Sequence, residues 1–179
     1  MPVTLRHYRE ADAEEVWTAA RESVVEVSPW MQWCHDGYTV ADAAAWIARS
    51  IAGHRDGRMF EFAIVDEHGT FVGSCGIRNV DRIDGFATVS YWIRTSRAGR
   101  GYATSAVSQL LKWGFANSDL HRLEFVVAEG NTRSARVAEN VGAEREGLLR
   151  HRLIHKGRLV NAHLYSVLRF DRVPGRTAG

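Results

Sequence analysis

The stretch Tyr91-Trp92-Ile93-Arg94-Thr95-Ser96-Arg97-Ala98-Gly99-Arg100-Gly101-Tyr102-Ala103-Thr104 decides the fold. The residues that lead into this stretch alternate in polarity, which predicts a strand from Phe86 to Arg94. The helical spacing of apolar residues after the glycines predicts a helix from Gly101 to about Asn117. The glycines between them permit a tight, positive-φ turn that directs successive backbone N–H groups toward one point. Because the helix adds its unpaired N-terminal donors and its positive dipole end, this junction predicts an anion site suited to phosphates.

Three arginines, Arg94, Arg97 and Arg100, add positive charge beside this glycine loop. The pattern GxxxxGK[ST] is absent, which disfavours a P-loop nucleotide triphosphatase. A dinucleotide-binding fingerprint would need a third glycine where Thr104 stands and would follow the first strand of a βαβ unit. The sequence meets neither condition.

The glycine loop instead resembles the coenzyme A pyrophosphate loop of the GNAT acetyltransferases, Gln/Arg-x-x-Gly-x-Gly/Ala, which lies between the fourth strand and the third helix. The segment from Ala98 to Ala103 occupies that place. The strand from Phe86 to Ile93 is similar to the Gly-Tyr-Trp strand of ribosomal-protein N-terminal acetyltransferases of the RimJ/RimL type. Asn131-Thr132-Arg133-Ser134-Ala135 is similar to their Asn-x-x-Ser-x motif. The resemblance runs from about residue 3 to residue 170.

This resemblance implies acetyl-CoA as co-substrate, with no metal ion. Ser134 would donate a hydrogen bond to the departing thiolate, and backbone N–H groups around Tyr91 to Ile93 would hold the acetyl carbonyl. The implied cofactor-binding residues are Tyr91, Trp92, Ile93, Arg94, Gly99, Arg100, Gly101, Tyr102, Ala103, Thr104, Asn131 and Ser134.

The sequence departs from the family pattern in three places. Ala98 stands where the loop begins with Gln or Arg, so the pyrophosphate is expected on backbone contacts rather than on that side chain. Thr88 stands where the fourth strand often carries a carboxylate and Ala138 where many members place a tyrosine acid, so the family pattern leaves the general base unassigned. The eight histidines contain no HExxH motif, so they predict no metal site. The candidate bases that remain open are Glu61, Glu124, His151 and His163.

The rest of the chain predicts a single α/β (α+β) domain over residues 1–172, with residues 173–179 as a frayed tail. The predicted strands are Val3 to Tyr8, Met59 to Val65, Phe71 to Val80, Phe86 to Arg94, Leu123 to Ala128, Glu144 to Ile154 and Leu159 to Phe170. The predicted helices are Ala11 to Ser28, Thr39 to Arg55, Gly101 to Asn117 and Thr132 to Val141. The order is βαα-βββ-α-β-α-ββ. With the family resemblance, it implies a GNAT-like mixed, mainly antiparallel seven-stranded sheet with about four helices.

Composition argues against a membrane-spanning, secreted or nucleic-acid-binding protein. The 179 residues, 45% of them apolar, can build one core, and no apolar run is long enough to span a membrane. Cys34 and Cys75 form no CxxC pair, and the N-terminus lacks the apolar stretch of a signal peptide, so a cytoplasmic monomer or homodimer is expected. The basic residues are scattered, which argues against a nucleic-acid partner.

Charge is divided unevenly along the chain. Residues 1–90 carry a net charge of −6 and residues 91–179 a net charge of +8. If the basic half holds coenzyme A, the acidic half is expected to supply the rim of the acceptor site. The expected acidic rim residues are Glu22, Glu26, Asp36 and Asp42, and the expected aromatic walls are Trp30, Trp33 and Tyr38.

Such a site favours an amine acceptor. By resemblance the acceptor is a protein or peptide N-terminus. Three alternatives stay open: transfer to a small-molecule amine such as an aminoglycoside or polyamine, transfer to a protein lysine, and a non-catalytic acyl-CoA-binding domain.

Overall fold

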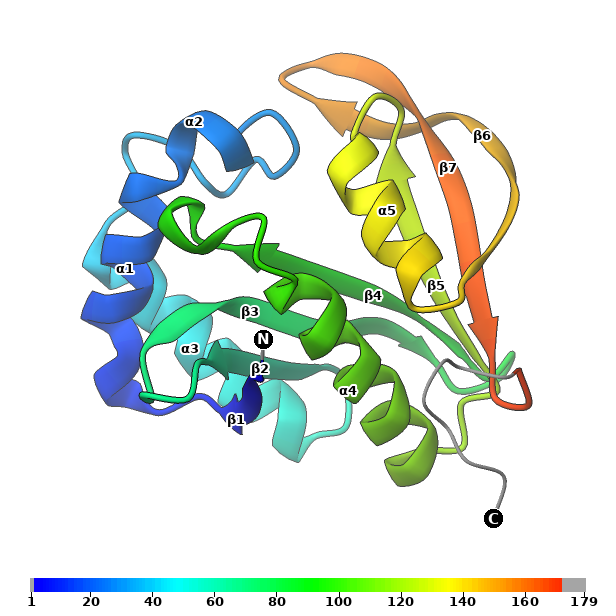
Figure 1. Ribbon diagram of the computed structural model, residues 1–179, viewed down its shortest axis with the longest axis horizontal. Helices are drawn as coiled ribbons and strands as arrows, with labels where there is room; N and C mark the ends of the chain where they lie inside the picture. Colours follow the sequence, from blue (N-terminus) through cyan, green and yellow to red (C-terminus); the bar gives the residue numbers. More distant parts are fainter. Residues whose placement is uncertain (1, 172–179) are drawn as a thin grey trace.

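The computed structural model describes residues 2–171, and within them one mixed sheet of seven strands carries helices on both faces (Figure 1). The strands are β1 (Thr4–His7), β2 (Phe60–Val65), β3 (Phe71–Asp81), β4 (Phe86–Ile93), β5 (Arg122–Ala128), β6 (Glu144–His155) and β7 (Arg158–Leu168). The helices are α1 (Ala13–Glu22), α2 (Val24–Val27), α3 (Val40–Arg55), α4 (Tyr102–Asn117) and α5 (Thr132–Asn140), with 3₁₀ turns η1 (Glu10–Asp12) and η2 (Thr95–Arg97). The predicted element order and mainly antiparallel sheet are confirmed. The predicted tail at 173–179 lies outside the described residues.

Two helix layers cover the sheet. On one face, α4 buries an apolar stripe that includes Ala106, Val107 and Leu110. On the other face, α1 and α3 bury Val16 and Ile47 against the sheet. Within residues 2–171, the helices are all too short or too polar to cross a bilayer.

The sheet opens between β4 and β5 (Figure 1). Strand order is β1-β2-β3-β4-β5-β7-β6, and β4 pairs with β5 in parallel from Phe86 to Thr88 alone, whereas it pairs with β3 as far as Ile93. The Arg94 N–H donates to the Val72 carbonyl on the β3 side at 2.9 Å. Because donors alternate along a strand, the N–H groups of Tyr91 and Ile93 point to the opposite side, into the opening.

The first predicted helix is wrong in one respect, because it is broken at Ser23. This residue leaves helical geometry at φ −105° and ψ 2°, and its hydroxyl donates to the Ala19 carbonyl at 2.6 Å. Such side-chain bonding competes with the helical ladder and separates α1 from α2. The predicted start of α3 is confirmed as a capping box, in which Thr39 and Asp42 exchange hydrogen bonds.

Candidate functional site

The junction from β4 to α4 has the geometry of an anion cradle. Gly99 and Gly101 take φ values of 76° and 80°, and Gly101 is the N-cap of α4, where no side chain caps the helix. A Cβ added to either glycine would meet nothing within 4 Å. The loop therefore presents an open backbone surface at a helix N-terminus, which suits the oxygens of a phosphate group.

The start of this loop is fixed to the α1–α2 junction by Glu22. Its carboxylate binds the Arg94 guanidinium through two hydrogen bonds, 2.9 Å from Nε and 2.6 Å from Nη2, and also accepts from the Ser96 N–H and hydroxyl. The Arg94 and Ser96 donors hold the pKa of Glu22 at about 2, well below its ordinary value. Nearby, the Thr95 hydroxyl donates to Glu26 at 3.0 Å.

Two of the residues expected at the acceptor rim hydrogen-bond the loop. Glu22 and Glu26 do not line the cavity described below and bind residues at the start of η2. The three loop arginines also differ from one another. Arg94 is neutralised by Glu22 and Arg97 lies 3.6 Å from Asp66, while Arg100 is exposed and makes no ion pair among the described residues.

The other side of the opening is formed by α5. The Asn131 side chain caps this helix by accepting from the Ser134 N–H at 3.1 Å. The Tyr91 phenol donates to the Ser134 carbonyl at 2.9 Å and lies 2.8 Å from the Ser134 hydroxyl. Burial raises the pKa of Tyr91 to about 12. Sequence analysis considered the backbone of Tyr91 and missed this phenol, which joins β4 to α5 beside Ser134.

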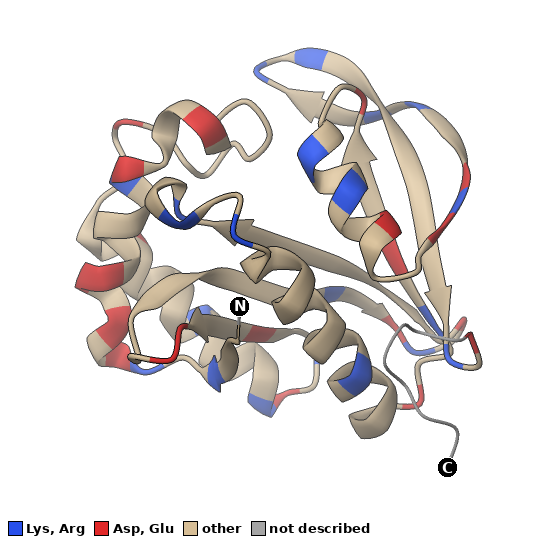
Figure 2. Cartoon of the chain, in the orientation of Figure 1, with Lys and Arg blue, Asp and Glu red and all other residues tan. Residues whose placement is uncertain are grey.

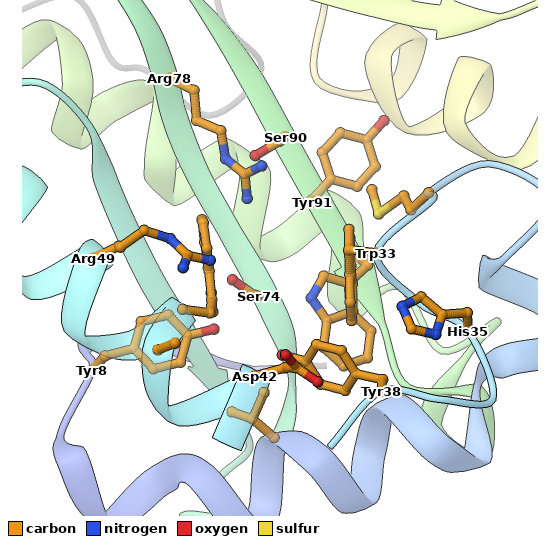
Figure 3. Close-up of a pocket in the computed structure, with 15 residues that line it drawn as sticks. Tyr8, Trp33, His35, Tyr38, Asp42, Arg49, Ser74, Arg78, Ser90 and Tyr91 are labelled. Atoms are coloured by element: carbon orange, nitrogen blue, oxygen red, sulfur yellow. The ribbon is translucent and has the colours of Figure 1, made fainter. Parts of the chain in front are cut away.

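A cavity of about 470 Å³ lies on the α1/α3 face of the sheet and reaches the same segment of β4 (Figure 3). Its apolar wall is largely aromatic, and Trp33 packs against Trp92 with ring centroids 5.1 Å apart. The lining residues are Tyr8, Val16, Met31, Trp33, His35, Tyr38, Asp42, Ala45, Trp46, Arg49, Ser74, Arg78, Ser90, Tyr91 and Trp92.

Of the aromatic residues expected around an acceptor, Trp33 and Tyr38 line this cavity. Trp30 does not; it is 41% exposed and faces Gly130. Of the expected acidic residues, Asp42 lines the cavity, while Asp36 does not. The cavity also holds Arg49 and Arg78, so it is not the acidic site that the charge division predicted.

Sequence analysis missed several lining residues for different reasons. Asp42, Trp46 and Arg49 stand at helical spacing on α3, so a search of its faces could have found Trp46 and Arg49. Tyr8 and Ser90 carry no such signal, because only the strand register brings them together.

The four candidate bases occupy different environments. Glu61 is buried below the cavity floor, where it binds Arg78. Glu124 lies beside Thr88 at the closed end of the opening and binds Arg122 at 2.7 Å. His151 sits in a bulge of β6 at φ 51°, and His163 lies 2.8 Å from Arg145. Only Glu61 among the four is next to residues that line the cavity. Among the described residues, no group of three or more His, Cys, Asp or Glu side chains could hold a metal ion.

A mixed sheet that opens beside a glycine loop at a helix N-terminus is the architecture of an acetyltransferase domain. The chain belongs to the GNAT family, since the model of the acetyltransferase (GNAT) domain matches residues 3–144. It is 34% identical over 106 residues to the uncharacterized N-acetyltransferase p20 of Bacillus licheniformis; the match covers 59% of this chain and 60% of that relative.

Solved structures extend the likeness over nearly the whole chain. RimJ of Mycobacterium smegmatis, solved in complex with CoA-disulfide, is 32% identical with a TM-score of 0.84, over 93% of this chain and 81% of that one. The ribosomal-protein-S5-alanine acetyltransferase of Vibrio fischeri has the same fold, with a TM-score of 0.85 and 22% identity over 96% of each chain.

Proposed function

We propose that this protein is an acetyl-CoA-dependent N-acetyltransferase that acetylates a primary amine, with the N-terminal α-amine of a peptide or protein as its acceptor. One observation carries the proposal: the cavity reaches β4 from Ser90 to Trp92, close to the end of the strand that leads through η2 into the glycine loop. A thioester held at the loop and an amine held in the cavity would therefore come together at the opening of the sheet.

In this proposal, the pyrophosphate of acetyl-CoA lies on the backbone of Gly99 to Ala103 and its pantetheine arm follows the opening toward α5. The N–H groups of Tyr91 and Ile93, which point into the opening, suit the carbonyl oxygen whose negative charge develops during attack. Ser134 stands across the opening beside Tyr91, and in this proposal its hydroxyl assists the departing thiolate. Arg94, Trp92, Thr104 and Asn131 shape this route.

The pKa of an α-amine and the names of similar proteins both support an N-terminal acceptor. An α-amine has a pKa near ~8, against ~10.4 for lysine, so less free energy is needed to provide its neutral form at neutral pH. The Vibrio fischeri protein is named a ribosomal-protein-S5-alanine acetyltransferase. Cys34 and Cys75 are free and buried, which fits a reducing compartment, and we place the reaction in the cytoplasm.

An acceptor screen tests this function. Purified protein is supplied with acetyl-CoA and with N-terminal peptides, blocked peptides that keep a lysine, polyamines or aminoglycosides, and free thiol is measured. We expect turnover with free N-terminal peptides and little with N-terminally blocked ones. Preference for a polyamine or aminoglycoside would replace the acceptor class. Binding of acetyl-CoA without thiol release from any amine would indicate the non-catalytic acyl-CoA-binding alternative.

A further inference from the structure

Two guanidinium groups enter the cavity from different elements and lie against one indole ring. Arg49 comes from α3 and Arg78 from β3, and their guanidinium carbons lie 5.8 and 4.7 Å from the ring centroid of Trp46. Figure 3 shows both side chains pointing toward the middle of the cavity. Two cations at one ring make a positive region inside the cavity, and such a region attracts an anion.

Both arginines keep hydrogen-bond donors that the protein does not use. Arg49 is exposed and makes no hydrogen bond or ion pair within residues 2–171. Arg78 donates through Nε to the buried carboxylate of Glu61, so its two Nη groups have no acceptor in the described part of the chain. A guanidinium presents its N–H groups as a planar fork that matches the two oxygens of a carboxylate. The cavity therefore offers free donors of the kind that bind a carboxylate.

The acidic residue that lines the cavity lies apart from this positive region. Asp42 is held at the N-terminus of α3, where its carboxylate accepts from the backbone N–H and the hydroxyl of Thr39. Arg49 follows two helical turns later, about 10 Å along the helix axis. Because Asp42 and Arg49 form no ion pair, Arg49 is able to bind an anion that comes from a ligand.

A second hollow of about 360 Å³ adjoins the cavity at Arg78, which lines both. Two more arginines, Arg58 and Arg82, line this hollow beside the turn between α3 and β2. Arg82 donates to the Gly57 carbonyl at 3.0 Å and forms no ion pair with any described residue. A basic path thus continues beyond the cavity, and a ligand that follows it is longer than one amino acid.

The strand register sets the distance from the opening of the sheet to these arginines. Arg78 pairs with Thr88, which lies four residues before Trp92 on β4, a distance of about 13 Å along the strand. An extended peptide advances ~3.3–3.6 Å per residue. If the α-amine lies at the opening beside Trp92, residues two to four of the peptide reach the arginines.

We propose that the acceptor is a peptide or protein N-terminus with acidic residues at positions two to four, whose side-chain carboxylates bind Arg49 and Arg78. The proposal deepens the transferase function above and rests on it. The first acidic side chains accept from the free donors beside Trp46, and the peptide then leaves the cavity over Arg82. The selected charge is opposite to the one that the uneven division of charge along the sequence predicted.

Three peptides test this selectivity. They share an N-terminal alanine and differ only at positions two to four, which carry aspartate, asparagine or lysine. With acetyl-CoA and detection of free thiol, we expect kcat/KM for the aspartate peptide to exceed that for the asparagine peptide by at least about tenfold. The lysine peptide should be the poorest acceptor, and the advantage of aspartate should shrink at high salt. Equal values for aspartate and asparagine, or a preference for lysine, would overturn the proposal.

Substitutions of Arg49 locate the selectivity. Because Arg49 is exposed and makes no ion pair with a described residue, its replacement leaves no charge of the protein unpaired. Arg49→Gln should lower kcat/KM for the aspartate peptide about tenfold and change the asparagine value by less than about twofold. Arg49→Glu should favour the lysine peptide. An advantage of aspartate that is unchanged in both variants would contradict the assignment of this subsite.

Two further variants separate peptide binding from folding and stacking. Arg78→Gln is combined with Glu61→Gln, so that no buried carboxylate loses its partner, and the pair should also remove the advantage of aspartate. Arg21→Gln is the matched control, since Arg21 stacks on Trp17 of α1 at 5.2 Å and does not line the cavity. It should keep the wild-type order of the three peptides.

Free alanine and free aspartate identify the source of the carboxylate, because a free amino acid also presents one. Neither spans the distance to the arginines, so we expect kcat/KM at least about tenfold below that of the aspartate peptide. A free amino acid that is preferred to every peptide would overturn this proposal together with the peptide acceptor. Turnover that does not distinguish the three peptides would overturn this proposal alone, and a protein that acetylates no amine would overturn the proposed function itself.

Discussion

At the N-terminus of α5, the Ser134 hydroxyl forms a hydrogen bond with the phenol of Tyr91, and the two oxygens are 2.8 Å apart. Its N–H is already held by Asn131, so removing the hydroxyl leaves the helix cap intact. We predict that Ser134→Ala lowers kcat by about 10- to 100-fold and changes the affinity for acetyl-CoA by less than about threefold, because a hydrogen bond to the leaving thiolate strengthens only in the transition state.

Steady-state kinetics and calorimetry check that prediction. Tyr91→Phe should give a smaller loss alone and add little to Ser134→Ala, since the two hydroxyls act as one pair. An unchanged kcat in Ser134→Ala would limit this hydroxyl to its local contact with Tyr91.

Gly101 has a φ of 80°, and a Cβ added there would meet nothing within 4 Å. A β-branched residue is strained at that φ and would turn the loop N–H groups away from a common point. We predict that Gly101→Val weakens acetyl-CoA binding by at least about 100-fold in calorimetry. Gly69→Val is a matched control, since Gly69 has a φ of 78° and equally open surroundings but lies in the β2–β3 turn. Equal affinity in the two variants would contradict the placement of the pyrophosphate.

Between elements, the contact of Glu22 with Arg94 and Ser96 joins α1 to the glycine loop across 72 residues of sequence. The folded-state pKa of Glu22, about 2, is below its ordinary value of 4.5. A depressed folded pKa stabilises the fold above the unfolded pKa, and this stabilisation is lost as the pH falls from about 4.5 toward 2.

We therefore predict that Glu22→Gln costs about 1 to 2 kcal/mol of unfolding free energy at pH 7, after allowance for solvent screening of a partly exposed pair. Between pH 4.5 and 2 the difference from wild type should shrink, as urea denaturation at several pH values would show. Glu67→Gln, on the exposed β2–β3 turn, is the control and should follow the wild-type curve. A difference that stays constant down to pH 2 would mean that Glu22 contributes no ionic contact.

The elements themselves were largely predictable because their signals are local. Helical spacing located α4, the Thr39/Asp42 capping box located the start of α3, and the glycines located the turn between β4 and α4. The contacts between elements were not predictable in the same way. Which residue Glu22 meets depends on how α1 packs against η2, and the position of the Glu61 carboxylate over Gly76 depends on the register of β2 with β3. Neither distance in sequence nor residue type contains that information.

Across the whole molecule, acidic residues gather on α1 and α2, and basic residues on α5 and the β6–β7 hairpin (Figure 2). The acidic side was expected to attract a cationic acceptor, but Glu22 and Glu26 are bound to the loop that precedes α4. The basic side remains available for an anionic co-substrate. Arg133 and Arg136 on α5 are exposed and make no ion pair among the described residues.

Coenzyme A carries three phosphate groups, so these α5 arginines should attract it over a distance set by ionic strength. The Debye length falls from ~10 Å at 0.1 M salt to ~3 Å at 1 M, and attraction between exposed charges weakens with it. We predict that the Kd for coenzyme A rises roughly tenfold between 0.05 and 0.5 M NaCl, and that neutralising Arg133 and Arg136 together to Gln weakens binding at low salt and about halves that dependence. The matched control is Arg55→Gln with Arg58→Gln, which removes the same charge at the end of α3, where both arginines already pair with Asp56. If the two double variants show the same salt dependence, the basic side of the molecule has no part in attracting the co-substrate, and affinity rests on the backbone of the glycine loop.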